Sequence, residues 1–204
     1  MTLPKAFNTN VVTTTPATDL MTTSMNQFII ETYCPFFDEF EYLFTETEKG
    51  LDESDHKTTF KGHQWDVSKR MKKDFSKIAK WTEDKCREQK IPIKNCKVNM
   101  SWCVDYHEGG YQHLHCHGPQ ELTVVIHLDG QPPIEETPQA THGMLYSIMP
   151  CPDGTQVLKN HIPEPGKCVI MDGKVFHGVY PVTGSRRTVV IDINFDWLDP
   201  EEKL

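Results

Sequence analysis

Three histidines occupy alternate positions in one short segment, GGYQHLHCHGP, at residues 109–119. They are His113, His115 and His117. Alternate side chains of a β-strand point to the same face, so the segment predicts a row of imidazoles on one face. Adjacent members of the row have Cα atoms about 6.6 Å apart and the ends about 13 Å apart, so two neighbours can chelate one metal ion while the third supports them. The spacing leaves open which pair chelates, and a polar face satisfied by water is the alternative for an isolated His-x-His motif.

A second block, at residues 163–195, supplies another histidine, His177. Its sequence is PEPGKCVIMDGKVFHGVYPVTGSRRTVVIDINF, and its pattern is turn, strand, turn, histidine, turn, strand. The first and last strands of a jelly roll lie close together, so a distal histidine can complete a site that a His-x-His pair begins. Three imidazoles on one face of an octahedral metal leave positions open, which is what an iron oxygenase requires.

Two arginines follow His177 in this block. A fixed guanidinium can hold a carboxylate through two parallel hydrogen bonds. Strand alternation places Arg186 and Thr188 on one face, where they could hold the far carboxylate of a dicarboxylic co-substrate. Arg187 would then face away, and it takes over the role only if the register slips by one residue. The alternative is that Arg186 is a surface residue at the start of a strand.

The C-terminal half has the pattern of a β-sandwich or barrel. After Pro92, short runs of strand-forming residues alternate with Gly and Pro turns. The irregular stretch at 129–143 is the longest in this half, and we predict that it forms a mouth loop or lid. We divide the chain into a jelly-roll catalytic core at 96–204 and an N-terminal extension with helical support at 1–95, within one structural domain overall.

The N-terminal part is expected to lean on that core. Apolar residues recur at nearly helical spacing over 67–89, with Asp66 placed as the N-cap and Pro92 as the stop. Residues 28–44 are rich in aromatics and are predicted to form a helix or turn packed on the core. We expect residues 1–24 to be frayed or an irregular edge, and the charged stretch at 46–57 to be a solvated loop.

Composition narrows the classes of partner. The 204-residue chain carries 21 Lys and Arg against 29 Asp and Glu, a net charge of −8, which argues against a nucleic-acid partner. No apolar run approaches the roughly 20 residues of a membrane span. The N-terminal residues lack the pattern of a signal peptide, so we expect a cytoplasmic protein. Seven cysteines without a Cys-x-x-Cys pair indicate free thiols in a reducing compartment. The oligomeric state does not follow from the sequence.

The two histidine-containing blocks resemble the 2-oxoglutarate/Fe(II)-dependent dioxygenase superfamily, in particular a branch of phages and marine bacteria with an His-x-His…His motif. GGYQHLHCHGPQELTVVIHL is similar to that branch's Gly-Gly-Tyr-Asn and His-x-His-Pro motifs and the strand after them. The second block is similar to its Pro-x-x-Gly, distal His, Val-x-Pro, Arg and Phe-Asn pattern. The resemblance spans about residues 98–197. It implies an α+β fold with a double-stranded β-helix (jelly-roll) core and N-terminal helices packed on it.

The resemblance also implies an activity and a set of site residues. The implied activity is hydroxylation of an unidentified small-molecule or protein side-chain substrate, coupled to decarboxylation of 2-oxoglutarate to succinate. The cofactors would be Fe(II), 2-oxoglutarate and O2, with ascorbate helpful in vitro. The implied catalytic metal ligands are His115, His117 and His177, with His113 in a supporting place. The implied co-substrate residues are Arg186, Thr188 and, by a weaker correspondence, Tyr106. The phage branch is also compatible with a phage-encoded protein that acts in the host cytoplasm.

One position departs from the wider superfamily. The usual motif is His-x-Asp, which gives two imidazoles and one carboxylate, whereas position 117 here is histidine. The phage branch shares this histidine, so the change does not by itself indicate an inactive enzyme. It removes one negative charge from the metal, which should weaken Fe(II) retention or shift redox behaviour. It also favours capture of Zn, Ni or Cu, since imidazole suits all of these metals.

Two other functions compete with the oxygenase. A cupin-type metalloprotein would use His115, His117, Glu121 and His177 without 2-oxoglutarate, but it needs no arginine nine residues after the distal histidine. A non-catalytic module could instead hold structural zinc through cysteine thiolates, although their scattered spacing is not typical of zinc sites. The candidate cysteines are Cys103, Cys116, Cys151 and Cys168.

Overall fold

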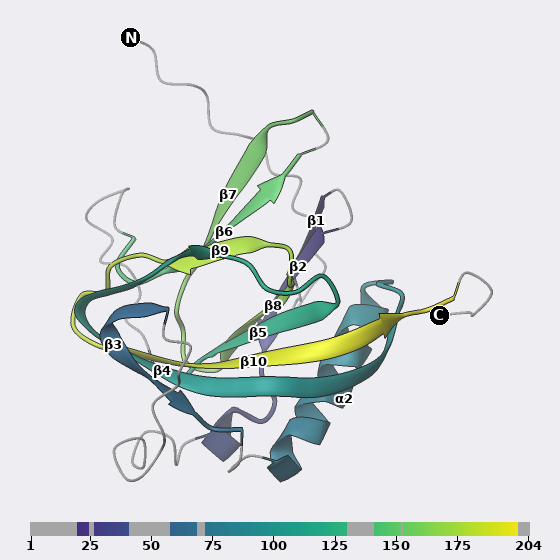
Figure 1. Cartoon of the computed structure of the whole chain (residues 1–204), viewed down its shortest axis with the longest axis horizontal. Helices are drawn as coiled ribbons and strands as arrows, with labels where there is room; N and C mark the ends of the chain where they lie inside the picture. The colour runs from purple at the N-terminus through teal and green to yellow at the C-terminus, as the bar shows by residue number, and fades with distance from the viewer. Residues whose placement is uncertain are drawn as a thin grey trace.

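The described residues form one curled antiparallel sheet of ten strands with a long helix against one side (Figure 1). This computed structural model describes residues 20–24, 27–40, 58–68, 72–129, 141–151 and 153–199. The strands are β1 Leu20–Ser24, β2 Gln27–Tyr33, β3 Thr59–Asp66, β4 Ile93–His115, β5 Glu121–His127, β6 Leu145–Pro150, β7 Gln156–His161, β8 Lys167–Asp172, β9 Phe176–Val179 and β10 Arg186–Trp197. The helices are the 3-10 helix η1 Phe37–Phe40 and the α-helix α2 Lys72–Glu88. The strand order is β1-β2-β8-β5-β10-β4-β9-β6-β7, with β3 on the side of β4, and it confirms the predicted jelly-roll core.

Strict alternation along the central strands gives the sheet two apolar faces. On β10, Val189 and Ile191 belong to an outer core that also contains Ile78 of α2. Val190 points the other way, into an inner core within the curl of the sheet. Figure 1 shows α2 beside β4, on the side of the sheet opposite β6, β7 and β9. The central strands are therefore buried on both faces, which is why they read as continuous apolar runs rather than alternating ones.

Helix α2 is shorter at its start than the sequence predicted. Asp66 is the last residue of β3, and its carboxylate accepts a hydrogen bond from the backbone N–H of Ser68 at 2.8 Å. Asp66 therefore caps the turn at Val67 and Ser68, which are not helical, and the described part of α2 is Lys72–Glu88. At the other end, Lys90 has a φ of 60° and the N–H of Ile91 bonds the carbonyl of Cys86 at 2.9 Å, so a left-handed residue ends the helix shortly before Pro92.

The N-terminal part contributes strands as well as a helix. β2 lies between β1 and β8, although residues 28–44 had been predicted as a helix or turn. Its residues Phe28 to Thr32 are all buried, because an interior strand covered on both faces shows no alternation to read. η1 supplies the short helical turn of that prediction. β3 pairs with β4, so strands before residue 95 belong to the same sheet as the predicted core.

Some predictions from the sequence fall outside the described residues. These include the charged loop at 46–57, most of the N-terminal stretch at 1–24 and all but the ends of the mouth loop at 129–143. The division of the chain near residue 95 stays a prediction. In the part of the chain that the structure describes, no helix is long and apolar enough to cross a membrane.

A buried ionic cluster ties the two ends of the curled sheet together. Glu31 of β2 is 7% exposed and lies 2.6 Å from Nζ of Lys159 on β7. Nδ1 of His161, also on β7, lies 3.3 Å from the same carboxylate, and Lys167 of β8 lies 3.7 Å away. Burial raises the pKa of Glu31, but His161 and Lys159 outweigh burial and hold it at about 2. Burial also lowers the pKa of His161, so Lys159 supplies the positive charge at neutral pH.

We predict that Glu31→Gln lowers the free energy of unfolding by up to about 3 kcal/mol at neutral pH. Because the pKa of Glu31 is held at about 2 in the folded chain, its stabilisation is complete above the ordinary value of 4.5 and is lost as pH falls toward about 2. The difference between the two proteins should therefore shrink in acid. Urea unfolding at neutral pH and at about pH 3 measures how this difference in unfolding free energy changes.

Glu164→Gln is the matched control, because Glu164 also contacts Lys167 but is 42% exposed. Its cost should stay within about 1 kcal/mol at both pH values. Equal costs for the two substitutions would contradict the role given to Glu31.

Candidate functional site

A bulge in β4 decides which histidines of the row face the interior. On β4, Gln112 pairs with Val179 of β9, and His115 pairs with His177. The stretch of β4 between these two pairs is therefore one residue longer than the stretch of β9 opposite it. The extra residue breaks the alternation. Gln112 is buried, whereas the side chain of His113 is exposed and packs edge-on against Tyr111. The prediction that all three histidines share a face was therefore wrong for His113.

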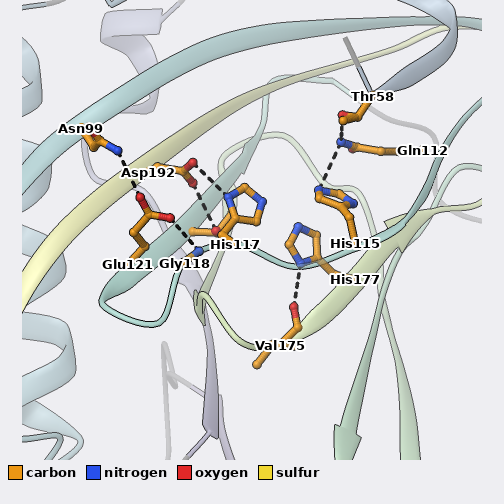
Figure 2. A network of polar contacts seen from close by, with 11 residues as sticks. Thr58, Asn99, Gln112, His115, His117, Gly118, Glu121, Val175, His177 and Asp192 are labelled. Carbon is orange, nitrogen blue, oxygen red and sulfur yellow. Dashed lines mark hydrogen bonds and ion pairs between the residues drawn. The ribbon is translucent and has the colours of Figure 1, made fainter. Parts of the chain in front are cut away.

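His115, His117 and His177 converge at one point inside the curl of the sheet (Figure 2). One ring nitrogen from each lies within 4.8 Å of the others, and the ring centroids are 4.4 to 5.3 Å apart. His115 ends β4, and His177 faces it from β9. His117 follows in an irregular stretch that is anchored by a 2.7 Å hydrogen bond from its backbone N–H to the carbonyl of Gly173.

The Nδ1 atom of each imidazole is already engaged by an acceptor. Those of His115 and His177 lie 2.8 and 3.0 Å from the backbone carbonyl two residues earlier. That of His117 lies 2.9 Å from Oδ2 of Asp192. These acceptors favour a proton on Nδ1 and leave each Nε2 as an acceptor, as in histidines that bind metals. The Nε2 of His115 also lies 3.4 Å from the side-chain amide of Gln112.

Burial keeps the imidazoles of His115 and His177 uncharged, so their ring nitrogens can bind a cation. Burial lowers the pKa of His115, and it lowers the pKa of His177 well below the ordinary value of 6.5, with the other two rings adding to the effect. Both rings are therefore neutral at neutral pH. Nε2 of His117 is buried and has no hydrogen-bond partner among the described residues. Three converging imidazoles, with the Nε2 of His117 left without a partner, fit a divalent transition metal such as Fe, Zn, Ni or Cu.

The predicted co-substrate residues lie deeper on the inner face. Arg186 is 2% exposed; Nη2 lies 3.0 Å from Nδ1 of His127, Nη1 bonds the carbonyl of Gly143, and Nε has no hydrogen-bond partner among the described residues. Burial lowers the pKa of Arg186 to about 10, so the guanidinium stays charged at neutral pH. Thr188 is also buried on this face.

Arg187 points to the other face of β10, as strand alternation predicts. Its Nε bonds the carboxylate of Asp105 on β4. The register of β10 against β4 is regular from Arg186 to Asp192, so no slip exchanges the two arginines.

Tyr106 and Gln112 connect the arginine to the histidines. The guanidinium carbon of Arg186 lies 5.6 Å from the ring centre of Tyr106. Burial raises the pKa of this phenol to about 12, and its hydroxyl donates a 2.9 Å hydrogen bond to Oε1 of Gln112. The Gln112 amide then lies 3.4 Å from Nε2 of His115 (Figure 2). A chain of direct contacts therefore links the two halves of the site.

Sequence reasoning missed three residues here. Asp192 could have been found by extending the alternation Arg186, Thr188 to the same face of β10. Gln112 was hidden by the bulge, and His127 carried no local signal, since it stands at the end of an apolar strand.

The ligand sets of the two competing functions are not assembled. Glu121 clusters with His117 and Asp192 rather than with the other two histidines. Its Oε2 accepts a 2.7 Å hydrogen bond from the N–H of Gly118, and its Oε1 accepts one from Asn99 at 3.1 Å. Neither of the two metal-compatible clusters among the described residues contains a cysteine.

Comparison with known proteins identifies the fold. No protein-family model matches the sequence, and no curated protein is similar to it. A prolyl-4-hydroxylase from Pseudomonas putida superposes with a TM-score of 0.56 at 14% identity, covering 81% of this chain and 91% of that one. HygX from Streptomyces hygroscopicus, solved with nickel and 2-oxoglutarate bound, gives 0.57 at 10% identity, covering 81% and 82%. The chain has the fold of the 2-oxoglutarate/Fe(II)-dependent oxygenases.

A 2OG-Fe(II) oxygenase family oxidoreductase from Burkholderia pseudomallei shares this oxygenase fold with a TM-score of 0.60 at 10% identity, covering 81% of this chain and 84% of that one. The fold that the sequence resemblance implied is therefore confirmed. At identities this low the likeness concerns the fold, and the site must be argued from this chain's own residues.

The bulge makes a direct prediction about metal binding. His115→Ala should weaken Co(II) binding by more than about 100-fold. Losing only the hydrogen-bond partner of a ligand can cost up to about 100-fold, and this variant loses the ligand itself. His113→Ala should change it by less than about 3-fold, because His113 offers the site only its backbone carbonyl. Titration monitored by the visible spectrum of Co(II) measures both. Equal losses would show that the whole row, rather than its inner members, binds the ion.

Proposed function

We propose that the protein is an Fe(II)- and 2-oxoglutarate-dependent oxygenase that hydroxylates a small-molecule or protein side-chain substrate. The observation that carries the proposal is the convergence of one ring nitrogen from each of three histidines, on the inner face of the sheet that also carries the buried Arg186. His115, His117 and His177 would hold the iron. Bound there, iron supplies the redox chemistry that couples decarboxylation of 2-oxoglutarate to succinate with hydroxylation of a C–H bond.

Arg186 is suited to hold the distal carboxylate of 2-oxoglutarate. Its guanidinium is buried and charged, and its hydrogen-bond partners among the described residues are a carbonyl and an imidazole rather than a carboxylate. Asp129 acts on it electrostatically without a hydrogen bond, so an incoming carboxylate that bonds the buried guanidinium directly would be favoured there. The free Nε–H and the hydroxyl of Thr188 are additional donors on the same face.

His127 offers a further donor beside the guanidinium. Burial, with the charge of Arg186, lowers the pKa of His127 well below its ordinary value, so the ring is neutral. Its Nδ1 accepts from Arg186, which leaves the proton on Nε2. That N–H is buried and has no hydrogen-bond partner among the described residues. Arg186 and His127 together could therefore bind one carboxylate through several hydrogen bonds.

The surroundings of the site would exclude water during the reaction. The inner core around it is apolar and includes Val104, Met149, Met171 and Val190. A dry cavity strengthens the electrostatic hold of the arginine on a carboxylate. The buried Tyr106 and Gln112 would fix the position of the arginine relative to the ligands, since each contacts the next.

Two proteins of similar fold have been solved with different classes of bound molecule. HygX has been solved with hygromycin B, and a prolyl hydroxylase from Trichoplax adhaerens with a peptide fragment. We infer that the substrate here is likewise a small molecule or a peptide side chain. The net charge of −8 disfavours a nucleic acid.

The proposal predicts turnover that depends on Arg186. Anaerobically purified protein given Fe(II), ascorbate, 2-oxoglutarate and then O2 should form succinate, at least in the uncoupled reaction. Arg186→Met should lower kcat/KM for 2-oxoglutarate by on the order of 30-fold or more, the cost of removing one member of a buried charge pair. Liquid chromatography with mass detection of succinate gives both values.

Arg187→Met is the control, because the neighbouring arginine points to the other face and pairs with Asp105. It should change kcat/KM by less than about 3-fold. Metal binding at the histidines without 2-oxoglutarate binding or succinate formation would favour the cupin-type function instead. Similar losses for both arginine variants would contradict the assignment of Arg186.

A further inference from the structure

We propose that Asp192 supplies through His117 the negative charge that a ligand set of three imidazoles lacks. The inference rests on the proposed metal site. It makes Asp192 a positioning and charge-supplying residue that does not touch the metal.

The geometry singles out Asp192. It lies on the inner face of β10 and is 4% exposed. Its Oδ2 is 2.9 Å from Nδ1 of His117, and its Oδ1 accepts a 3.2 Å hydrogen bond from Thr123. Thr123 is its cross-strand partner on β5, so the regular pairing of two central strands fixes the carboxylate. Figure 2 shows the Asp192 carboxylate beside the His117 imidazole, on the side away from His115 and His177.

The other two ligands have no such partner. His115 and His177 donate to backbone carbonyls, which are neutral acceptors. Among the described residues, Asp192 therefore provides the only carboxylate hydrogen-bonded to a member of the triad. Glu121 is close to it, but both of its oxygens are held by Gly118 and Asn99.

A carboxylate behind an imidazole changes what that imidazole can give to a cation. A carboxylate hydrogen-bonded to a ligating imidazole orients the ring and strengthens it as a donor to the metal. Asp192 would also bring a negative charge to the cation from behind one imidazole ring, where the His117 side chain is only 10% exposed and screening by water is weaker than at the surface. Three imidazoles alone would leave the two positive charges of the cation uncompensated.

The alternative is that Asp192 only sets the orientation of the ring. Asp192→Asn separates the two roles, because the amide oxygen can still accept from Nδ1 while the charge is lost. On our proposal, metal-stripped Asp192→Asn should bind Mn(II) and Co(II) about 10- to 100-fold more weakly than the wild-type chain. Glu121→Gln removes a charge from the same cluster without touching a ligand's hydrogen bond, and it should change affinity by less than about 3-fold.

A second variant removes the ring that Asp192 would orient. His117→Asp replaces the imidazole by a carboxylate, so an effect of Asp192 in this background cannot come from ring orientation. Adding Asp192→Asn to His117→Asp should still lower Mn(II) affinity, because a negative charge near the cation is lost. This remaining loss is expected for a role in charge and not for a role in ring orientation.

The experiment is isothermal titration with Mn(II) and Co(II), with the melting temperature of each metal-free variant recorded to confirm folding. Equal affinities for wild type and Asp192→Asn would overturn this inference alone, as would an unchanged affinity on adding Asp192→Asn to His117→Asp. Failure of the wild type to bind either metal, or unchanged binding by His177→Ala, would instead overturn the proposed site on which the inference rests.

Discussion

The pairing of His115 with His177 across β4 and β9 is the contact on which the rest of the site depends. These residues are 62 positions apart in the sequence, and only the antiparallel register of two strands brings them together. The bulge before His115 sets that register by turning Gln112 and His115 inward and His113 outward. A bulge of one residue therefore decides which imidazoles share a point, and strand geometry decides how firmly they are held there.

The same two-faced sheet explains the rest of the inner wall. Arg186, Thr188, Val190 and Asp192 follow one another at every second position of β10, so one strand supplies the buried guanidinium, an apolar side chain and the carboxylate that pairs with His117. The opposite face of that strand packs on α2. Because the two buried faces differ in polarity, a slip of one residue would move Arg186, Thr188 and Asp192 into the outer apolar core, so packing specifies the register strongly.

Sequence reasoning reached the parts of this arrangement that follow local rules. It found a β-sandwich or barrel from short apolar runs, the jelly-roll core from the family resemblance, and the faces of Arg186 and Arg187 from alternation, because β10 pairs regularly there. It failed where pairing with a distant strand overrides a local rule. The bulge at His113 depends on β9, and β2 looked helical because its burial on both faces hides any period of two. His127 gave no signal, since only the fold brings it to Arg186.

The central claim is that three imidazoles bind one iron while Arg186 holds a dicarboxylate beside it. An anomalous-scattering map from anaerobic crystals containing Fe(II) and 2-oxoglutarate tests it directly. The account predicts a single strong peak about 2.0–2.2 Å from Nε2 of His115, His117 and His177, with a carboxylate on the guanidinium of Arg186. A peak ligated by Glu121, or an ordered metal site with no density against Arg186, would contradict it.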